Sequence, residues 1–260
     1  MTNRIYLDNA ATTPIDPVVL EAMLPFLQEK YGNPSSIYSF GRETRLAVET
    51  ARKSVARLLN AHPGELFFTS GGTESSNTII CGAVRDLGCT HIITSAIEHH
   101  ATLHTVEELH RRGEVSYSEV KLRSDGHVQL DDLEYLLQTH ADEKILVSLL
   151  HANNEIGNLL DWKEVGELCR QYGAFFHADT VQTVGHLPID LRQTPVHFIT
   201  GSAHKFHGPK GVGLLYVNEN VKINPYLVGG GQERNMRAGT ENVYGIVGFA
   251  KALELAMQNY

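Results

Sequence analysis

Residues 199 to 213, ITGSAHKFHGPKGVG, take the chain from the end of an apolar run into a loop rich in glycine. The loop carries Lys205, whose neighbours include Ser202, His204 and His207 but no carboxylate. A lysine amine without a salt-bridge partner loses its proton more readily when it is desolvated, and a neutral amine is what a Schiff base requires. Most loop lysines are simply solvated, so this stretch alone leaves both a catalytic lysine and an ordinary surface lysine open.

Short apolar runs alternate with amphipathic segments along most of the chain. The runs predict strands, and apolar residues at helical spacing predict helices. We expect strands at residues 66–69, 91–94, 115–120, 145–150, 174–178, 196–200 and 212–217, and helices at 17–27, 42–60, 73–87, 99–112, 130–139 and 161–172. A further apolar run, Ile5 to Leu7, predicts a strand that enters an ordered loop. This alternation is typical of an α/β fold with a mostly parallel sheet flanked by helices on both faces.

The composition narrows the class of protein. The formal charge of -8 and the isoelectric point near 5.9 argue against nucleic acid or an anionic membrane surface as the main partner, since both need basic patches. No stretch approaches the length needed to span a bilayer. Cys81, Cys89 and Cys169 form no CxxC pair, which argues against a disulfide framework or a zinc site. We therefore expect a cytoplasmic protein without a metal centre.

In such sheets ligands bind outside the carboxyl ends of the strands, so the residues after each strand are the candidates for a site. Gly72 and Thr73 follow an early strand and begin a helix, where free N–H groups and the helix dipole suit a phosphate. An ordinary tight turn explains them equally well. His99 follows the next strand and could lie against a planar ligand or merely cap a helix. Both explanations stay open for each position.

Polar residues also follow two of the later strands. Asn154 belongs to the polar cluster HANNEIG, which needs hydrogen-bond partners such as the edges of a heteroaromatic ligand. Asp179 follows a buried strand and is costly there unless it meets a cation. Pyridoxal phosphate needs an acid for its ring nitrogen, a lysine for a Schiff base and a helix N-terminus for its phosphate. Asp179, Lys205 and Thr73 together predict this cofactor far more specifically than any one of them.

The chain carries, in this order, the motifs IYLDNAATTP, YGNPSS, TSGGTES, IEHHA, HANNEIG, HADTVQTVG, GSAHKFHGPKG and GGGQERNMRAGTEN. Together they closely resemble the motifs of cysteine desulfurases, in the class V branch of the pyridoxal phosphate-dependent fold type I aminotransferase superfamily. The resemblance covers essentially the whole chain from Ile5. It implies a large fold type I domain that binds pyridoxal 5'-phosphate.

The resemblance also implies roles for individual residues. Lys205 matches the Schiff-base lysine, Asp179 the acid that pairs with the ring nitrogen, and His99 the histidine that stacks on the ring and helps in proton transfer. Other positions match residues that bind the phosphate, or that contact the ring oxygen or the substrate; they are Thr73, Ser202 and His204, and Gln182 and Asn154, respectively. Thr240 matches a residue that reaches the phosphate of the neighbouring subunit, which implies a homodimer with shared active sites.

The implied reaction converts L-cysteine to L-alanine and passes the sulfur on as an enzyme persulfide. The sulfur would serve iron-sulfur clusters or other sulfur compounds, with a sulfur-acceptor protein as a further partner. The family carries its acceptor cysteine and its substrate-carboxylate arginine in a small C-terminal domain, which we expect this chain to lack. We expect residues 1–15 to form a segment on the active-site and small-domain side, and residues 16–260 to form the large domain, ending in the interdomain helix.

The three cysteines are not expected to replace the family's acceptor. Cys81 and Cys169 lie in helical segments and are expected to be buried, whereas Cys89 lies at a helix-to-strand turn and is the one expected to be exposed. Two alternatives stay open. One is a truncated protein that binds the cofactor and dimerises without turnover, and the other is a related class V lyase such as selenocysteine lyase.

Overall fold

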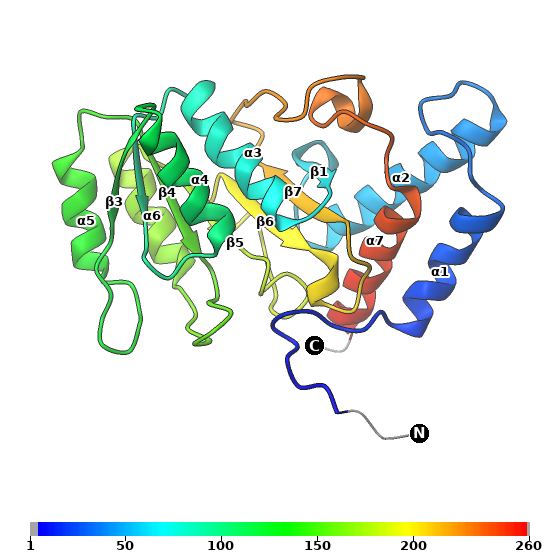
Figure 1. The fold of residues 1–260 in the computed structure, drawn as a ribbon, viewed down its shortest axis with the longest axis horizontal. Helices are drawn as coiled ribbons and strands as arrows, with labels where there is room; N and C mark the ends of the chain where they lie inside the picture. The colour runs from blue at the N-terminus through cyan, green and yellow to red at the C-terminus, as the bar shows by residue number, and fades with distance from the viewer. Residues whose placement is uncertain (1–4, 259–260) are drawn as a thin grey trace.

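The fold centres on one seven-stranded sheet, in a computed structural model that describes residues 5–258 (Figure 1). The strands lie in the order β1-β7-β6-β5-β4-β2-β3. Their bounds are β1 Leu66–Thr69, β2 His91–Thr94, β3 Ser116–Glu119, β4 Ile145–Leu150, β5 Phe175–Asp179, β6 Phe198–Ser202 and β7 Gly213–Val217. Neighbours pair in parallel except for β7, which is antiparallel to β1 and β6. The prediction of a mostly parallel sheet is confirmed.

Helices cover both faces of this sheet (Figure 1). Their bounds are α1 Pro17–Gln28, α2 Ser39–Leu58, α3 Gly72–Arg85, α4 His100–Arg111, α5 Leu130–Thr139, α6 Trp162–Tyr172 and α7 Val243–Gln258. The apolar residues of α3 and α4 pack on one face, against alternate strand residues such as Ile92 and Leu146. The other face is covered by α2, α5, α6 and α7, and α1 packs against α7. Within residues 5–258 no helix is both long and apolar enough to cross a membrane.

Burial explains why the apolar runs form strands. Every residue of β1, β2 and β4 is buried. A strand that is covered on both faces must be apolar on both faces, and this produces a continuous run rather than an alternating pattern. These three strands accordingly have the bounds that the sequence predicts.

Two strands end later than predicted, and the last residue of each is one of the predicted site residues. β5 extends to Asp179 and β6 extends to Ser202. Asp179 pairs with Thr200, and Ser202 pairs with Gly213, so ladder pairing continues to these positions. Asp179 and Ser202 are therefore held by the sheet itself and not by the loops that follow it.

The strand predicted from Ile5 to Leu7 is wrong. These residues form no strand, and Ile5 and Leu7 are 82% and 87% exposed. The chain instead runs on along the turn after β6. The backbone N–H and the hydroxyl of Thr13 both donate to the carbonyl oxygen of His204, at 2.9 Å each, and the same hydroxyl accepts from the N–H of His207 at 2.7 Å. An apolar run alone does not make a strand where no neighbouring strand pairs with it.

The predicted division into residues 1–15 and 16–260 reaches beyond the described part of the chain, because residues 1–4 and 259–260 lie outside it. Within the described part, the N-terminal segment lies against the turn after β6, and α7 is the last helix. The division into two units stays a prediction.

Candidate active site

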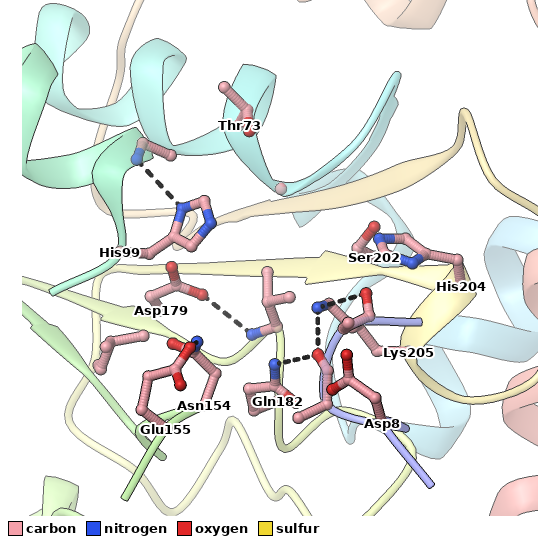
Figure 2. Close-up of a pocket in the computed structure, with 16 residues that line it drawn as sticks. Asp8, Thr73, His99, Asn154, Glu155, Asp179, Gln182, Ser202, His204 and Lys205 are labelled. Atoms are coloured by element: carbon pink, nitrogen blue, oxygen red, sulfur yellow. Dashed lines mark hydrogen bonds between the residues drawn. The ribbon is translucent and has the colours of Figure 1, made fainter. Parts of the chain in front are cut away.

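A cavity of about 520 Å³ opens at the carboxyl ends of β4, β5 and β6 (Figure 2). Leu150, Asp179 and Ser202, the last residues of these strands, line it. All but one of the predicted site residues line it as well: Gly72, Thr73, His99, Asn154, Asp179, Gln182, Ser202, His204 and Lys205. The exception is Thr240. Residues that lie far apart in the sequence thus meet at one edge of the sheet, as their positions after the strands predict.

Lys205 lies in the short 3-10 turn Ala203–Lys205, directly after β6. Its amine donates to the carbonyl oxygens of Ala10, at 2.5 Å, and Ala11, at 3.0 Å, and forms no ion pair within residues 5–258. Burial lowers the pKa of this amine below its usual value, although the carboxylates of Asp179 and Asp8 act in the opposite direction. Lys205 therefore gives up its proton more readily than a surface lysine does.

Asp179 is buried, and one of its two carboxylate oxygens is already engaged. Oδ1 accepts from the Thr200 hydroxyl at 2.9 Å and from the N–H of Val181 at 3.0 Å. Oδ2 has no hydrogen-bond partner among the described residues. A free oxygen on the carboxylate of a buried residue calls for a donor, and Asp179 lines the cavity, so a cationic or N–H group of a ligand could supply it.

The start of α3 also borders the cavity. Gly72 begins the helix, and a side chain there would come within 2.6 Å of a methyl group of Val181. Gly213 on β7 similarly leaves room for the backbone of Gly71, which its Cβ would meet at 2.6 Å. The first N–H groups of a helix have no partner within the helix. A glycine turn packed this closely therefore exposes donors that suit an anion, and the hydroxyl of Ser202 lies close to the same turn.

His99 caps a helix and also lines the cavity, so its expected place against a planar ligand stays a prediction. It is the N-cap of α4, where its Nδ1 accepts from the N–H of Ala101 at 3.1 Å. It also lines the cavity, and in Figure 2 its ring lies between Thr73 and Asp179. Because Nδ1 accepts the capping bond, the neutral ring carries its proton on Nε2. The cap thus fixes the tautomer of a histidine that faces the site.

The polar groups around Lys205 hold the N-terminal segment in place. Gln182 donates through Nε2 to the carbonyl oxygen of Ala10 at 3.0 Å, so Ala10 accepts from two cavity residues. Nδ1 of His204 lies 3.1 Å from the hydroxyl of Thr12. Burial, with the charge of Lys205 as the next cause, lowers the pKa of His204. The ring of His204 is therefore neutral near pH 7 and offers a hydrogen bond rather than a charge.

Thr240 is not brought to this cavity. It is exposed and lies in the loop that precedes α7. Its predicted role concerns a neighbouring subunit, so its place outside the cavity of its own chain leaves that role a prediction.

Several residues of the cavity were not predicted individually from the sequence, although the segment that carries three of them was expected on the active-site side. Asp8, Ala10 and Ala11 line it from the N-terminal segment, and Glu155 and Val181 line it from the loops after β4 and β5. For Asp8, Ala10 and Ala11 the sequence offered one signal, which is that the residues DNAATTP interrupt an apolar run. Their contribution through backbone carbonyl groups has no sequence signal, because every residue type has such a group.

The expected exposure of the cysteines is wrong for two of the three. Cys89 is buried, whereas Cys81, expected to be buried, is half-buried; Cys169 is buried as expected. Burial raises the pKa of all three thiols, that of Cys89 to about 12. Cys89 packs with the side chains between α3, α4 and the sheet, so its turn faces inward. No cysteine of the described residues lines the cavity, and none has the lowered pKa of a reactive thiol.

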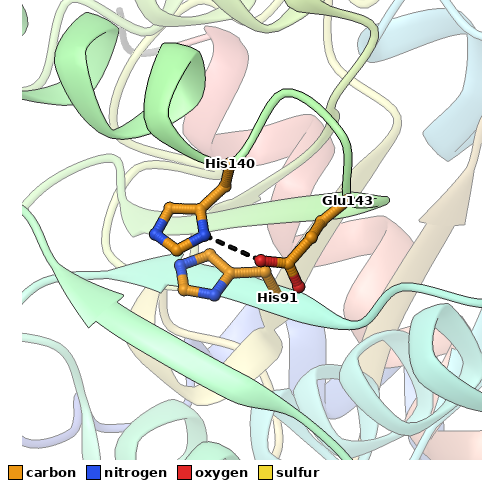
Figure 3. Close-up of side chains that lie close together, drawn as sticks. All are labelled: His91, His140 and Glu143. Atoms are coloured by element: carbon orange, nitrogen blue, oxygen red, sulfur yellow. Dashed lines mark hydrogen bonds and ion pairs between the residues drawn. The ribbon is translucent and has the colours of Figure 1, made fainter.

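A second cluster of titratable groups lies at the amino end of β2, the end opposite the cavity (Figure 3). The side chains of His91, His140 and Glu143 place possible metal-ligand atoms within 4.8 Å of one another. The two imidazoles, however, are stacked with centroids 3.6 Å apart and planes 13° apart. Both His91 nitrogens already meet hydroxyls, those of Ser116 at 2.6 Å and Ser118 at 3.1 Å. Lone pairs lie in the ring planes, so nearly parallel rings cannot both point at one ion. His91 instead links β2 to the serines of β3, and Glu143 accepts from the hydroxyl of Thr90.

Comparisons with known proteins identify the family of the chain. A family model described as Aminotransferase class-V matches residues 5–260. Cysteine desulfurase IscS of Dictyoglomus turgidum is 50% identical over 260 residues, which are 99% of this chain and 65% of that protein. Cysteine desulfurase IscS of Methanosarcina thermophila is 50% identical over 256 residues, 97% of this chain and 62% of that protein. The chain thus spans somewhat less than two thirds of the length of these curated relatives.

Solved structures share the fold. A NifS-like protein superposes with a TM-score of 0.94 at 43% identity, covering 98% of this chain and 70% of the other. SspA, solved in complex with cysteine, superposes with a TM-score of 0.90 at 32% identity, covering 96% of this chain and 72% of the other. The predicted fold type I architecture is therefore confirmed. On the family match and these likenesses together, the chain belongs to the aminotransferase class-V family.

Proposed function

We propose that the chain is the cofactor-binding large domain of a pyridoxal phosphate-dependent cysteine desulfurase. One observation carries the proposal. The amine of Lys205, the free carboxylate oxygen of Asp179 and the glycine turn at the start of α3 all border the same cavity. A lysine, an acid and an anion site are the three protein groups that this cofactor requires.

The residues present fit pyridoxal phosphate at each of its reactive points. Oδ2 of Asp179 would accept from the ring N–H, and Lys205 would attach covalently to the aldehyde carbon. The first N–H groups of α3, at Gly72 and Thr73, would receive the phosphate. The cradle depends on the missing side chain at Gly72, which Val181 would otherwise meet. Ser202 and His204 would add hydrogen bonds to the phosphate, and Gln182 and Asn154 to the ring oxygen or the substrate.

When bound, the cofactor supplies an electron sink for negative charge at the substrate's α-carbon. The chain's own residues would manage the protons. Asp179 would hold the proton of the ring nitrogen, since its buried carboxylate is already braced by two donors. The neutral amine of Lys205 would accept a proton from the α-carbon, which its lowered pKa favours. Nε2 of His99 would hold or move a further proton on the other side of the cavity.

The substrate assignment is supported by the names of the relatives. Two of them are cysteine desulfurases, and the solved SspA structure contains cysteine. The proposed reaction takes L-cysteine and an acceptor thiol to L-alanine and a persulfide. The acceptor sulfur forms an S–S bond to the sulfur of cysteine as the Cβ–S bond breaks. The electron pair of the broken bond stays on the β-carbon, which takes up the proton that the acceptor thiol gives up and becomes the methyl group of alanine. The acceptor thiol would lie outside residues 5–258, for example in a partner protein, because no cysteine within these residues lines the cavity. The persulfide would serve iron-sulfur clusters or other sulfur compounds.

The remaining parts of the proposal rest on family resemblance. The chain would act in the cytoplasm as a homodimer in which Thr240 reaches the phosphate of the neighbouring site. Residues 1–15 would belong with the active site, and residues 16–260 would form the large domain. The contacts of Thr13 with His204 and His207 support the placing of residues 1–15 with the active site, since they tie the N-terminal segment to the turn that carries Lys205.

A second candidate function is cofactor binding without turnover of cysteine by this chain alone. The position of the cysteines favours it, because all three have raised pKa values and lie away from the cavity. A class V lyase of related specificity, such as a selenocysteine lyase, would use the same cavity with another amino acid.

Two measurements on the purified chain test these functions. The first titrates pyridoxal phosphate and follows visible absorbance, with the variant Lys205→Ala and, as matched control, Lys210→Ala at an exposed lysine of the same loop. We expect the absorbance change in the wild type and the control but not in Lys205→Ala.

The second measurement determines the alanine that is formed from L-cysteine or L-selenocysteine, with dithiothreitol as the acceptor of the sulfur or selenium. Alanine from L-cysteine supports the desulfurase, and a cofactor-loaded chain that forms none supports the second candidate.

A further inference from the structure

The loop that leads to α7 contains a run of left-handed backbone. Glu233, Arg234 and Asn235 have φ angles of 43°, 56° and 66°. Residues with a Cβ atom adopt this conformation at a cost, and a run of three is unusual. A strained run of this kind persists only where surrounding contacts hold it, and such runs concentrate near functional sites. The contacts that hold this one lead to the cavity.

The first contact is a buried ion pair. Glu233 accepts from Nη1 and Nη2 of Arg52 at 2.8 and 2.9 Å, and the two side chains are 2% and 1% exposed. Glu233 also accepts from the N–H of Phe68 at 2.8 Å, and Arg52 donates to the carbonyl oxygen of Leu66 at 2.8 Å. The turn is thus fixed to α2 and to β1, the strand that leads into the glycine turn.

The second contact brings the same loop to the start of α3. Arg237 donates from Nε and Nη2 to the two carboxylate oxygens of Glu74, at 2.9 and 3.2 Å. Glu74 directly follows Thr73, a cavity residue, and accepts from the N–H of Ser70 at 2.9 Å. Burial opposes the ionisation of Glu74, but the bonds from Arg237 and Ser70 outweigh it, so the pKa of Glu74 lies below its usual value. Glu74 is therefore an anion next to the turn where a phosphate would bind.

An anion at this position has two opposite effects. Its bond to the N–H of Ser70 braces the turn from outside the cavity, which leaves the N–H groups of Gly72 and Thr73 for a ligand. Its charge, however, repels a phosphate at short range. Arg237 neutralises this charge and holds the carboxylate in place at two points.

We propose that Arg237 is a positioning residue for the phosphate group of the ligand: it acts through Glu74, and the left-handed turn anchored by Arg52 and Glu233 aims it there. The inference rests on the proposed function for the identity of the ligand. The role concerns the phosphate alone. It is separate from the attachment of the aldehyde to Lys205.

The test compares pyridoxal phosphate with pyridoxal, which has the same ring and aldehyde but no phosphate. Dissociation constants of both are measured for the wild type, Arg237→Gln, Glu74→Gln/Arg237→Gln and the control Arg111→Gln, which removes an exposed pair with Glu108 on α4. We expect Arg237→Gln to weaken pyridoxal phosphate about tenfold and pyridoxal less than about twofold, because an unpaired Glu74 repels only the phosphate. The double variant should recover most of the loss, and the control should match the wild type.

Equal weakening of both ligands by Arg237→Gln, or weakening of neither, would overturn the proposal. Where Arg237→Gln does not fold, as judged by circular dichroism, Arg237→Lys takes its place. That variant keeps the charge but not the two-point bond, so it should lose a smaller part of the preference for pyridoxal phosphate; equal weakening of both ligands would again count against the positioning role.

A wild-type chain that binds neither pyridoxal phosphate nor pyridoxal contradicts the proposed function. The role of Arg237 is then tested with inorganic phosphate as the ligand, by its effect on the melting temperature. Phosphate should raise the melting temperature of the wild type more than chloride at equal ionic strength does, and should raise that of Arg237→Gln less. Equal shifts in the two proteins would overturn the inference.

Discussion

Gly72 lies where a larger residue cannot be placed without moving its neighbour. A Cβ at this position would lie 2.6 Å from Cγ2 of Val181, well inside van der Waals contact. Val181 is itself fixed, because its N–H donates to Asp179 at 3.0 Å. The glycine turn and the carboxylate of Asp179 are thus linked through one residue. Close approach, rather than flexibility, is the reason for glycine here.

We predict that Gly72→Ala weakens the binding of pyridoxal phosphate about tenfold, since overpacking costs about 1–3 kcal/mol. Val181→Ala removes the methyl group that the new Cβ meets, so the double variant Gly72→Ala/Val181→Ala should recover most of the affinity. Absorbance titration of the wild type, both single variants and the double variant measures this. A double variant as weak as Gly72→Ala would show that the contact with Val181 is not the cause.

At the scale of elements, the site depends on a segment that belongs to no helix or strand. The N-terminal segment lies against the turn after β6, and its carbonyl groups at Ala10 and Ala11 accept from Lys205. Thr13 is 3% exposed and bonds both sides of that turn, at His204 and His207. The position of the lysine is therefore set jointly by β6 and by the N-terminal segment.

We predict that Thr13→Val lowers the free energy of unfolding by about 1–3 kcal/mol, because it removes two hydrogen bonds of the buried Thr13 hydroxyl, the one donated to the carbonyl oxygen of His204 and the one accepted from the N–H of His207. Thr13→Ser keeps the hydroxyl and should differ from the wild type by less than about 1 kcal/mol. Urea unfolding of the three proteins, followed by circular dichroism, measures the difference. Equal losses in the Val and Ser variants would mean that the methyl group, and not the hydroxyl, matters.

Much of the fold and the site follows from the sequence because the signals are local. Fully buried runs such as residues 145–150 predict their strands to the residue, and the polar groups after them predict the cavity. The strand expected from Ile5 fails because pairing depends on distant partners. The left-handed turn at Glu233 also escapes prediction, since its cause is a buried contact with Arg52, 181 positions away. Features of the backbone that depend on contacts between residues far apart in the sequence leave no mark in the local pattern of residue types.

At the scale of the whole molecule, buried histidines make stability depend on pH. Burial lowers the pKa values of His91, His151 and His177 to about 4, and a neighbouring His140 contributes for His91. In the unfolded chain these groups titrate near their ordinary value of about 6.5, so the unfolded state binds more protons between about pH 6.5 and 4. Stability is therefore complete above about pH 6.5 and declines as the pH falls toward 4. Buried Glu98, with a raised pKa, acts in the opposite direction.

We predict that His177→Asn reduces the pH dependence of unfolding in this window. The histidine is fully buried, with its Nδ1 at 2.8 Å from the hydroxyl of Ser148, and its share of the decline is on the order of 3 kcal/mol. Urea midpoints between pH 4.5 and 7.5 measure the slope. The variant should bind about one proton fewer on unfolding near pH 5. A control at exposed His104, whose ring has no hydrogen-bond or ion-pair partner among the described residues, His104→Asn, should keep the wild-type slope. An unchanged slope in His177→Asn would contradict the assigned cause.

The most direct test of the central proposal is to trap the cofactor on the chain. The protein is incubated with pyridoxal phosphate, reduced with borohydride, digested and examined by mass spectrometry. A neutral amine forms the bond that borohydride fixes, so the residue with the lowered pKa in the cavity should carry the label. We predict one phosphopyridoxyl group per chain on the peptide that contains Lys205. A label on Lys210 or another lysine, or no label at all, would contradict the proposal.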